Sequence, residues 1–151
     1  MSSAPIRSAL LFLLPVAAAL CLAYFIAGPV HYYDEGGMLA NALAVTGSNS
    51  ADDNHYYFGY PILLAPSVLL ADTPPELFRW VQLTNIVIYG LSCLLIFLFL
   101  RHQTTSTDLP PSYNRYFFAI CACLFPSFVS FTHMAWSENL IFLLVTASAY
   151  F

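Results

Sequence analysis

The sequence contains no lysine and few charged side chains of either sign. Its 151 residues include 4 basic side chains, all arginine, and 8 acidic ones, so 8% of the residues are charged, whereas roughly 25% is usual for globular proteins. A chain with so little polar surface does not dissolve as one compact domain. The net charge of −4 leaves no basic stripe to follow a phosphate backbone, which excludes nucleic acid as a partner.

Several familiar chemical motifs are missing as well. The four cysteines lie in apolar runs, without Cys-x-x-Cys or zinc-ligand spacing, and we expect them to be buried apolar residues. Gly-rich phosphate loops, dinucleotide-binding fingerprints and Ser/His/Asp nucleophile motifs are also absent. Apolar residues dominate instead: 60% of the chain is hydrophobic, 17% is aromatic, and the mean hydropathy is +0.72. This composition predicts a membrane protein, with lipid as the solvent for much of its surface.

Long uncharged runs locate the expected membrane spans, because a helix that crosses about 30 Å of hydrocarbon needs about 20 mostly apolar residues. Three runs of this length lie between Arg7 and Asp34, between Arg79 and Arg101, and between Arg115 and Glu138. A fourth opens after Glu138 and reaches the last residue, so we expect the chain to be a truncated, amino-terminal portion of a longer protein. We therefore predict one all-α membrane domain, residues 1–151, built as a multi-pass transmembrane helical bundle with spans at about 8–30, 78–100, 116–133 and 138–151.

The arginines set the expected orientation. A further uncharged run, Asn54 to Ala71, is interrupted by prolines, and its continuous apolar part of about a dozen residues suits an interfacial segment better than a crossing. With this run on one side, Arg7 shares a compartment with the Arg101 to Arg115 connection, which the positive-inside rule makes cytoplasmic. The amino terminus is then cytoplasmic, in a plasma or inner membrane. A cleaved signal sequence is the alternative for the first run, which is longer than the about 7–15 apolar residues of a typical signal.

The loop at 31–77 is therefore extracytoplasmic, and it carries six of the eight acids and neither lysine nor arginine. It opens with the carboxylate pair Asp34-Glu35, beneath tyrosines suited to the membrane–water interface. Helical spacing from Met38 to Thr46 predicts a short helix on the membrane, ended by Gly47 in a left-handed conformation. A second interfacial helix is expected up to Ala71, after which two prolines start the second span, where their missing N–H groups cost least.

Short motifs follow one another in a recognisable order along the chain. They are Tyr33-Asp34-Glu35 after the first span, a juxtamembrane helix with Ala40, Ala42 and Gly47, then Gly59-Tyr60-Pro61, Ala65-Pro66, Arg79 and Asn85 in the second span, Phe125-Pro126, and Trp136-Ser137-Glu138-Asn139 before the fourth. This order resembles the GT-C fold of integral-membrane glycosyltransferases, the superfamily of protein O-mannosyltransferase-like and lipopolysaccharide-core sugar transferases. The resemblance covers essentially the whole chain. It implies a glycosyltransferase that moves a sugar from a polyprenyl-phosphate donor to an extracytoplasmic acceptor.

The resemblance also implies that Asp34 is the catalytic carboxylate. Sugar transfer needs a base that takes the proton of the acceptor hydroxyl as this attacks the anomeric carbon, and in such enzymes an acid of the first extracytoplasmic loop fills this role. Glu35 is the neighbour that would orient Asp34 or a metal ion. From the residues alone a structural role is favoured, with Asp34 as the N-cap of a helix that starts near Gly36.

Four further residues are candidates for substrate binding: Arg79, Tyr60, Ser137 and Glu138. Arg79 is the basic residue expected on the outer side, where it would contact the donor phosphate or, as the alternative, reach lipid headgroups from a helix end. Ser137 and Glu138 would face substrate or, equally, cap the fourth helix and complement its dipole. Tyr60 belongs to one of the matching motifs.

Metal binding and a second class of function stay open. His31, His55, Asp52 and Asp53 have side chains of types that bind divalent metal ions, but a polar turn explains Asp52 and Asp53 better. We therefore assign no metal ligand and leave a divalent ion as an open cofactor.

The expected partners are a lipid-linked sugar donor and membrane lipids. The rival hypothesis is a non-enzymatic multi-pass protein, a transporter fragment or assembly subunit. Transporters place polar residues at mid-membrane depth, whereas the acids here gather at one interface, which favours the transferase.

Overall fold

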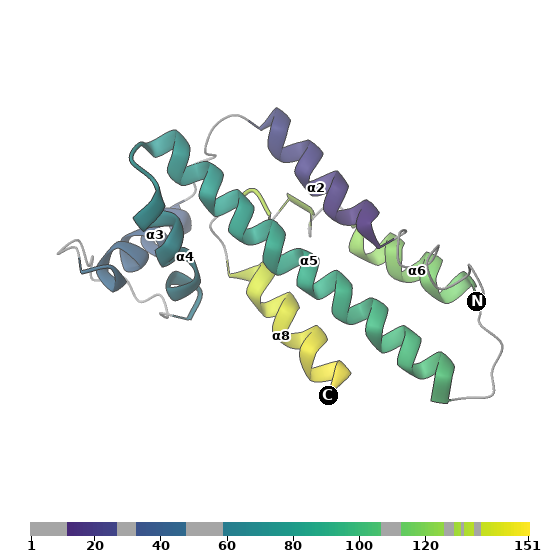
Figure 1. The fold of residues 1–151 in the computed structure, drawn as a ribbon. Coiled ribbons are helices and arrows are strands. Elements are labelled where there is room, and N and C mark those ends of the chain that lie inside the picture. Colours follow the sequence, from purple (N-terminus) through teal and green to yellow (C-terminus); the bar gives the residue numbers. More distant parts are fainter. Residues whose placement is uncertain are drawn as a thin grey trace.

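The computed structural model describes residues 12–26, 33–47, 59–106, 113–125, 129–130, 132–134 and 137–151. All regular elements within these ranges are helices, which confirms the predicted all-α class for this part of the chain (Figure 1). They are α2 (Leu13–Phe25), α3 (Tyr33–Val45), α4 (Gly59–Leu70), α5 (Pro74–Ser106), α6 (Tyr113–Cys123) and α8 (Glu138–Tyr150).

The long helix α5 begins at a well-defined cap. Pro74 and Pro75 occupy its first two positions, as the sequence predicts, because their missing N–H groups are not needed there. The hydroxyl of Thr73 accepts the backbone N–H of Glu76 at 3.4 Å, and the carboxylate of Glu76 accepts the backbone N–H of Asp72 at 3.0 Å. This reciprocal arrangement is a variant of the capping box, and it fixes where the helix starts.

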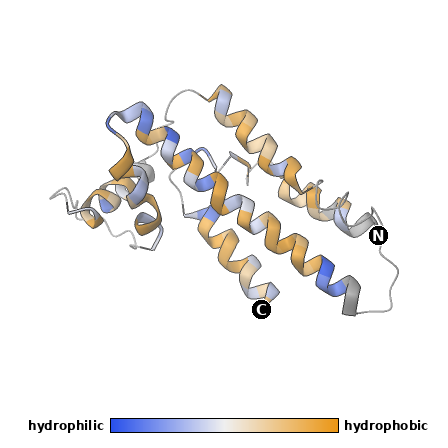
Figure 2. Ribbon diagram, viewed as in Figure 1, coloured by the Kyte–Doolittle hydropathy of each residue, from blue (hydrophilic) through white to orange (hydrophobic). Residues whose placement is uncertain are grey.

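Helix α5 has 33 residues and is therefore about 50 Å long at 1.5 Å per residue. Its segment Pro74–Gln103 is the single helix, among the residues described, that is long and apolar enough to cross a membrane. The other apolar helices, including α2, α4 and α8, have 10–17 residues. Figure 2 shows the middle of α5 as a hydrophobic stretch between more hydrophilic ends. One possible membrane helix follows from length and composition, and the four predicted spans stay a prediction.

Helix directions alternate around α5. In Figure 1, α2 and α6 run against the direction of α5, whereas α8 runs with it. The contacts agree, since α2, α6 and α8 each pack on α5, and α2 also packs on α6. The α3–α4 pair lies at the end where α5 begins, with α4 in contact with α5. This arrangement gathers the end of α2, the start of α5 and the two loop helices at one end of the molecule.

The helix predicted over 116–133 is interrupted. Helix α6 ends at Cys123, residues 129–130 are helical again, and Thr132–Met134 form a turn. The cause lies in the sequence, because Phe125 precedes Pro126, and a proline both lacks an N–H and disfavours the helical conformation of the residue before it. The Thr132–Met134 turn lies against α5, where His133 and Met134 are hydrogen-bonded to Gln82 and Asn85.

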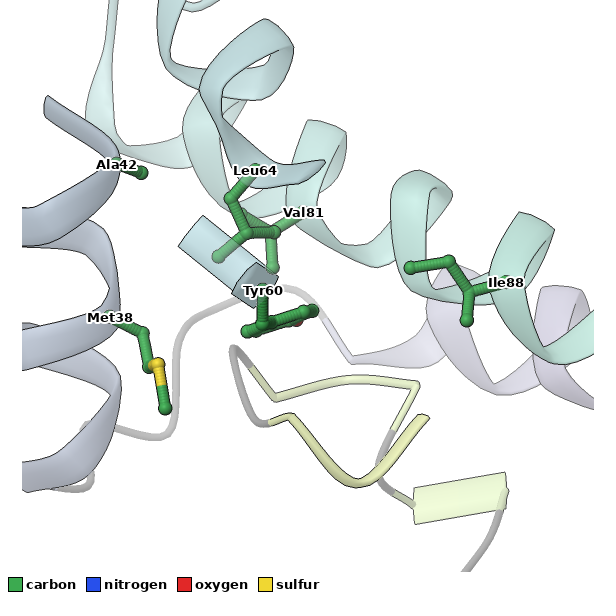
Figure 3. Close-up of a cluster of buried hydrophobic side chains, with 6 residues drawn as sticks. All are labelled: Met38, Ala42, Tyr60, Leu64, Val81 and Ile88. Atoms are coloured by element: carbon green, nitrogen blue, oxygen red, sulfur yellow. The ribbon is translucent and has the colours of Figure 1, made fainter. Parts of the chain in front are cut away.

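The loop helices are attached to α5 by one apolar cluster. Its buried members are Met38 and Ala42 of α3, Tyr60 and Leu64 of α4, and Val81 and Ile88 of α5, and Leu140 and Leu143 of α8 pack against them (Figure 3). In Figure 3 the side chains of Tyr60 and Leu64 lie between Met38 on one side and Ile88 on the other. Burial of this kind contributes roughly 25 cal/mol per Å² of apolar surface, so the pair is held as part of the fold.

A second apolar cluster joins α2, α5 and α6. It includes Ala19, Tyr89, Cys93 and Cys123, and the hydroxyl of Tyr89 donates to the backbone carbonyl of Cys123. The expected burial of the cysteines is confirmed for Cys93 and Cys123, but Cys21 and Cys121 are exposed. Cys121 differs from Cys123 because residues two apart on a helix point to different faces.

Candidate functional site

Buried polar side chains are concentrated where α5 meets α4, α8 and the 132–134 turn. Those with less than a twentieth of their surface exposed are Asn41, Gln82, Asn85, Thr132, His133 and Asn139, together with Ser67 and Ser92. Burying a polar group costs free energy unless it is hydrogen-bonded, and polar groups buried in a chain this apolar are functional-site hypotheses by default. Two chains of hydrogen bonds account for four of these eight side chains, namely Asn85, Gln82, Thr132 and His133.

The first chain runs through Asn85, whose side chain is fully buried. Its amide oxygen accepts the hydroxyl of Tyr60 at 2.7 Å, and its amide nitrogen donates to the carbonyl oxygen of Met134 at 2.6 Å. One side chain thus connects α4, α5 and the turn before α8. A separate bond of 2.9 Å between the hydroxyls of Ser67 and Thr84 strengthens the contact between α4 and α5.

The second chain starts at Arg79. Because arginine can only donate, the donor and the acceptor of each hydrogen bond along this chain can be assigned in turn. A guanidinium only donates, so the Gln82 oxygen, 3.3 Å from Arg79 Nη1, accepts. The Gln82 amide nitrogen must then donate to His133 Nδ1, also 3.3 Å away. His133 therefore carries its proton on Nε2 and donates it to the Thr132 hydroxyl at 3.3 Å, and Thr132 donates to the Val129 carbonyl at 2.6 Å. The chain requires a neutral imidazole in one tautomer.

Arg79 also joins two helices. The same Nη1 atom donates to the carbonyl oxygen of Ala23, in the last turn of α2, where carbonyl groups lack helical donors and a positive charge is favourable. Arg79 is exposed, and within the part of the chain that the structure describes its Nε and Nη2 groups make no hydrogen bond to protein. This edge of the guanidinium is a planar fork that fits a phosphate or carboxylate.

Ser137 and Glu138 lie at the start of α8, where they were expected. Ser137 occupies the N-cap position, but its side chain makes no capping hydrogen bond. Glu138 stands in the first turn, where its negative charge is favourable. Its Oε2 atom is buried and has no hydrogen-bond partner among the described residues. An unsatisfied buried carboxylate oxygen is costly, and this one is suited to accept a hydroxyl group or to face a cation.

The two predicted catalytic residues belong to the first turn of α3. This helix begins at Tyr33, so Asp34 and Glu35 are within it, and Asp34 is not the N-cap of a helix starting near Gly36. The positions of their side chains lie outside the described part of the structure. Helix α3 ends as predicted, with Gly47 at a φ of 88°.

The remaining candidates divide between the buried network and the undescribed part of the chain. Tyr60 is 2% exposed, and its hydroxyl is used by Asn85. His31, His55, Asp52 and Asp53 fall outside the described residues. Within the described ranges, no group of three or more His, Cys, Asp or Glu side chains could hold a metal ion.

Sequence reasoning missed three members of the network. Gln82, Thr132 and His133 were not singled out, although each is a polar residue inside an apolar run. That position is the signal that could have found them, because polar residues at membrane depth are rare and usually paired. Which residues pair could not be inferred, since Gln82 and His133 are 51 positions apart.

Comparisons of the sequence with protein-family models and with curated proteins, and of the structure with solved structures, found no significant match. The resemblance to GT-C glycosyltransferases stays a prediction that rests on the motifs of the sequence.

Proposed function

We propose that this chain is part of a membrane glycosyltransferase that moves a sugar from a polyprenyl-phosphate donor to an extracytoplasmic acceptor. The observation that supports it best is the exposed guanidinium of Arg79 at the start of the candidate membrane helix, whose Nη1 is held by two protein acceptors while Nε and Nη2 make no hydrogen bond to the described residues. The start of α3, with Asp34 and Glu35, belongs to the helix pair packed at the same end of α5.

The proposed reaction needs two charges at this end of the molecule. The oxygen of the acceptor hydroxyl attacks the anomeric carbon, the bond from that carbon to the phosphate oxygen breaks, and the lipid phosphate leaves with the bonding electrons. Asp34 takes the hydroxyl proton, and Glu35 orients Asp34. Arg79 offsets the charge that develops on the leaving phosphate. Glu138 and Ser137 face the sugar or the acceptor, because the orphan carboxylate oxygen of Glu138 suits a hydroxyl donor.

The test is sugar transfer by the protein expressed from its complete reading frame and reconstituted in liposomes with a synthetic polyprenyl-phosphate sugar. Released polyprenyl phosphate is measured. Asp34→Asn should reduce transfer by about a hundredfold or more, because asparagine cannot accept the proton. The matched control is Asp72→Asn, which changes an exposed acid of the same loop and should leave the rate unchanged.

Equal rates for the wild type and Asp34→Asn would remove Asp34 from the mechanism. A wild type that transfers no sugar from any polyprenyl-phosphate donor, but whose melting temperature rises with added divalent cations, would instead support the non-enzymatic alternative, in which the loop acids bind cations.

A further inference from the structure

We infer that Gln82 and His133 are positioning residues, which hold the guanidinium of Arg79 as a ready-made fork for the phosphate group of a polyprenyl-phosphate lipid. The inference rests on the proposed function for the identity of the ligand. The orientation of the fork follows from the hydrogen bonds themselves.

An arginine on an exposed helix face normally samples many rotamers, and fixing one of them costs side-chain conformational entropy. The side chain of Arg79 is already ordered in the folded protein, because Nη1 is held between the carbonyl of Ala23 and the amide oxygen of Gln82. The two acceptors take one nitrogen and leave the Nε and Nη2 edge available. A phosphate that binds this edge does not have to order the side chain, which is the usual advantage of a preorganised site.

His133 is needed to orient the side-chain amide of Gln82, which has an acceptor oxygen on one side and a donor NH2 group on the other. The terminal torsion of a glutamine is broad and roughly two-fold, so Gln82 could present either its oxygen or its NH2 group to the guanidinium. The NH2 group would repel Arg79, since both are donors. The acceptor Nδ1 of His133 attracts the NH2 group and so turns the oxygen toward Arg79.

Thr132 completes the arrangement. Its hydroxyl donates to the carbonyl of Val129 at 2.6 Å and therefore offers a lone pair to His133 Nε2. This keeps the imidazole proton on Nε2 and leaves Nδ1 as the acceptor that Gln82 requires. Each donor in the chain faces one acceptor, from Arg79 to the backbone of residue 129.

The experiment measures binding of polyprenyl phosphate, with the uncharged polyprenol as reference lipid, to the purified full protein in nanodiscs of zwitterionic lipid. His133→Leu should weaken polyprenyl-phosphate binding by about fivefold to tenfold, the value of one net hydrogen bond, and leave polyprenol binding unchanged. His133→Asn, which keeps an acceptor near the Nδ1 position, should restore binding to within about twofold of wild type. Thr84→Val breaks a hydrogen bond of the same helix away from Arg79, so it serves as the matched control with no expected change.

The possible outcomes distinguish a failure of the proposed function from a failure of the positioning role of His133. A wild type that does not prefer polyprenyl phosphate to polyprenol contradicts the proposed function. A preference that persists unchanged in His133→Leu overturns the positioning role alone, as does an Asn variant as weak as the Leu variant. If His133→Leu does not fold, Thr132→Val decides, because it keeps the side-chain volume and removes only the group that sets the tautomer. It should weaken phosphate binding in the same direction by about twofold to threefold, and wild-type affinity in this variant also overturns the role.

Discussion

Asn85 is the residue whose replacement should most clearly reveal how the helices are held together. It is fully buried, and both ends of its amide are hydrogen-bonded, to the hydroxyl of Tyr60 and to the carbonyl of Met134. Asn85→Leu keeps the branched shape and the number of non-hydrogen atoms of the side chain and removes both bonds at once. It takes this partner away from the buried hydroxyl of Tyr60 and from the partly buried carbonyl of Met134.

The size of the effect depends on the surroundings. In water-soluble proteins, a buried group left without its partner costs about 1–3 kcal/mol, which gives about 2–6 kcal/mol for the two groups. Between helices in a membrane, a side-chain hydrogen bond contributes about 0.6 kcal/mol on average and at most about 1.7 kcal/mol, because the unfolded chain finds other partners there. Since Asn85 lies within the candidate membrane helix, we expect a loss of about 1–3 kcal/mol.

The assay is reversible unfolding in mixed micelles with increasing SDS, followed by far-ultraviolet circular dichroism. Tyr60→Phe removes one of the two bonds and should cost about 1 kcal/mol in the wild-type protein. In the Asn85→Leu background the same Tyr60→Phe change should cost less than in the wild-type protein, because the bond to Asn85 is already absent. Equal destabilisation by Tyr60→Phe in both backgrounds would refute the interaction, and so would an Asn85→Leu protein as stable as wild type.

Three further predictions concern the membrane topology, the end of α3 and the guanidinium group of Arg79. In intact cells, a membrane-impermeant thiol reagent should label Asp72→Cys, just before the candidate span, and spare Gln103→Cys, at its last residue. Both positions are exposed, and the reverse pattern would invert the proposed orientation. Gly47→Ala should lower the free energy of unfolding by about 1 kcal/mol in the same SDS titration, because Gly47 has a positive φ and the added methyl group meets no atom within 4 Å, so the cost is conformational only. Arg79→Lys should lower sugar transfer by roughly tenfold, because an ammonium cannot bond Ala23 and Gln82 and also present a planar fork. A fully active Lys variant would leave Arg79 with only its structural role.

The features that sequence reasoning predicted correctly are those set by near neighbours in the chain. Gly47 ends α3 with a positive φ, and Pro74 begins α5, because each depends on the conformational preference of one residue. The start of α3 was misplaced toward Gly36, since a carboxylate stabilises a helix both as its N-cap and within its first turn, and the pattern does not separate the two positions.

The features that could not be predicted depend on residues far apart. Arg79 was singled out, yet its bond to Ala23 joins positions 56 apart, and nothing in either segment marks the other as its partner. The unbroken apolar run after Arg115 hid the turn at Thr132–Met134, because hydropathy treats Phe125-Pro126 as ordinary span residues. Local patterns indicate that a helix exists, whereas the polar contacts between helices come from packing.

The buried network bears on the two roles first considered for Arg79. An arginine that only reaches for lipid headgroups needs a flexible side chain and no polar groups behind it. Arg79 instead has a buried glutamine and a buried histidine behind it, and each would cost about 1–3 kcal/mol if left unpaired. Retaining two such groups in an apolar interior is favourable only when the whole chain of donors and acceptors is complete. That chain ends on a guanidinium whose Nε and Nη2 groups have no protein partner among the described residues, an arrangement suited to binding an anion.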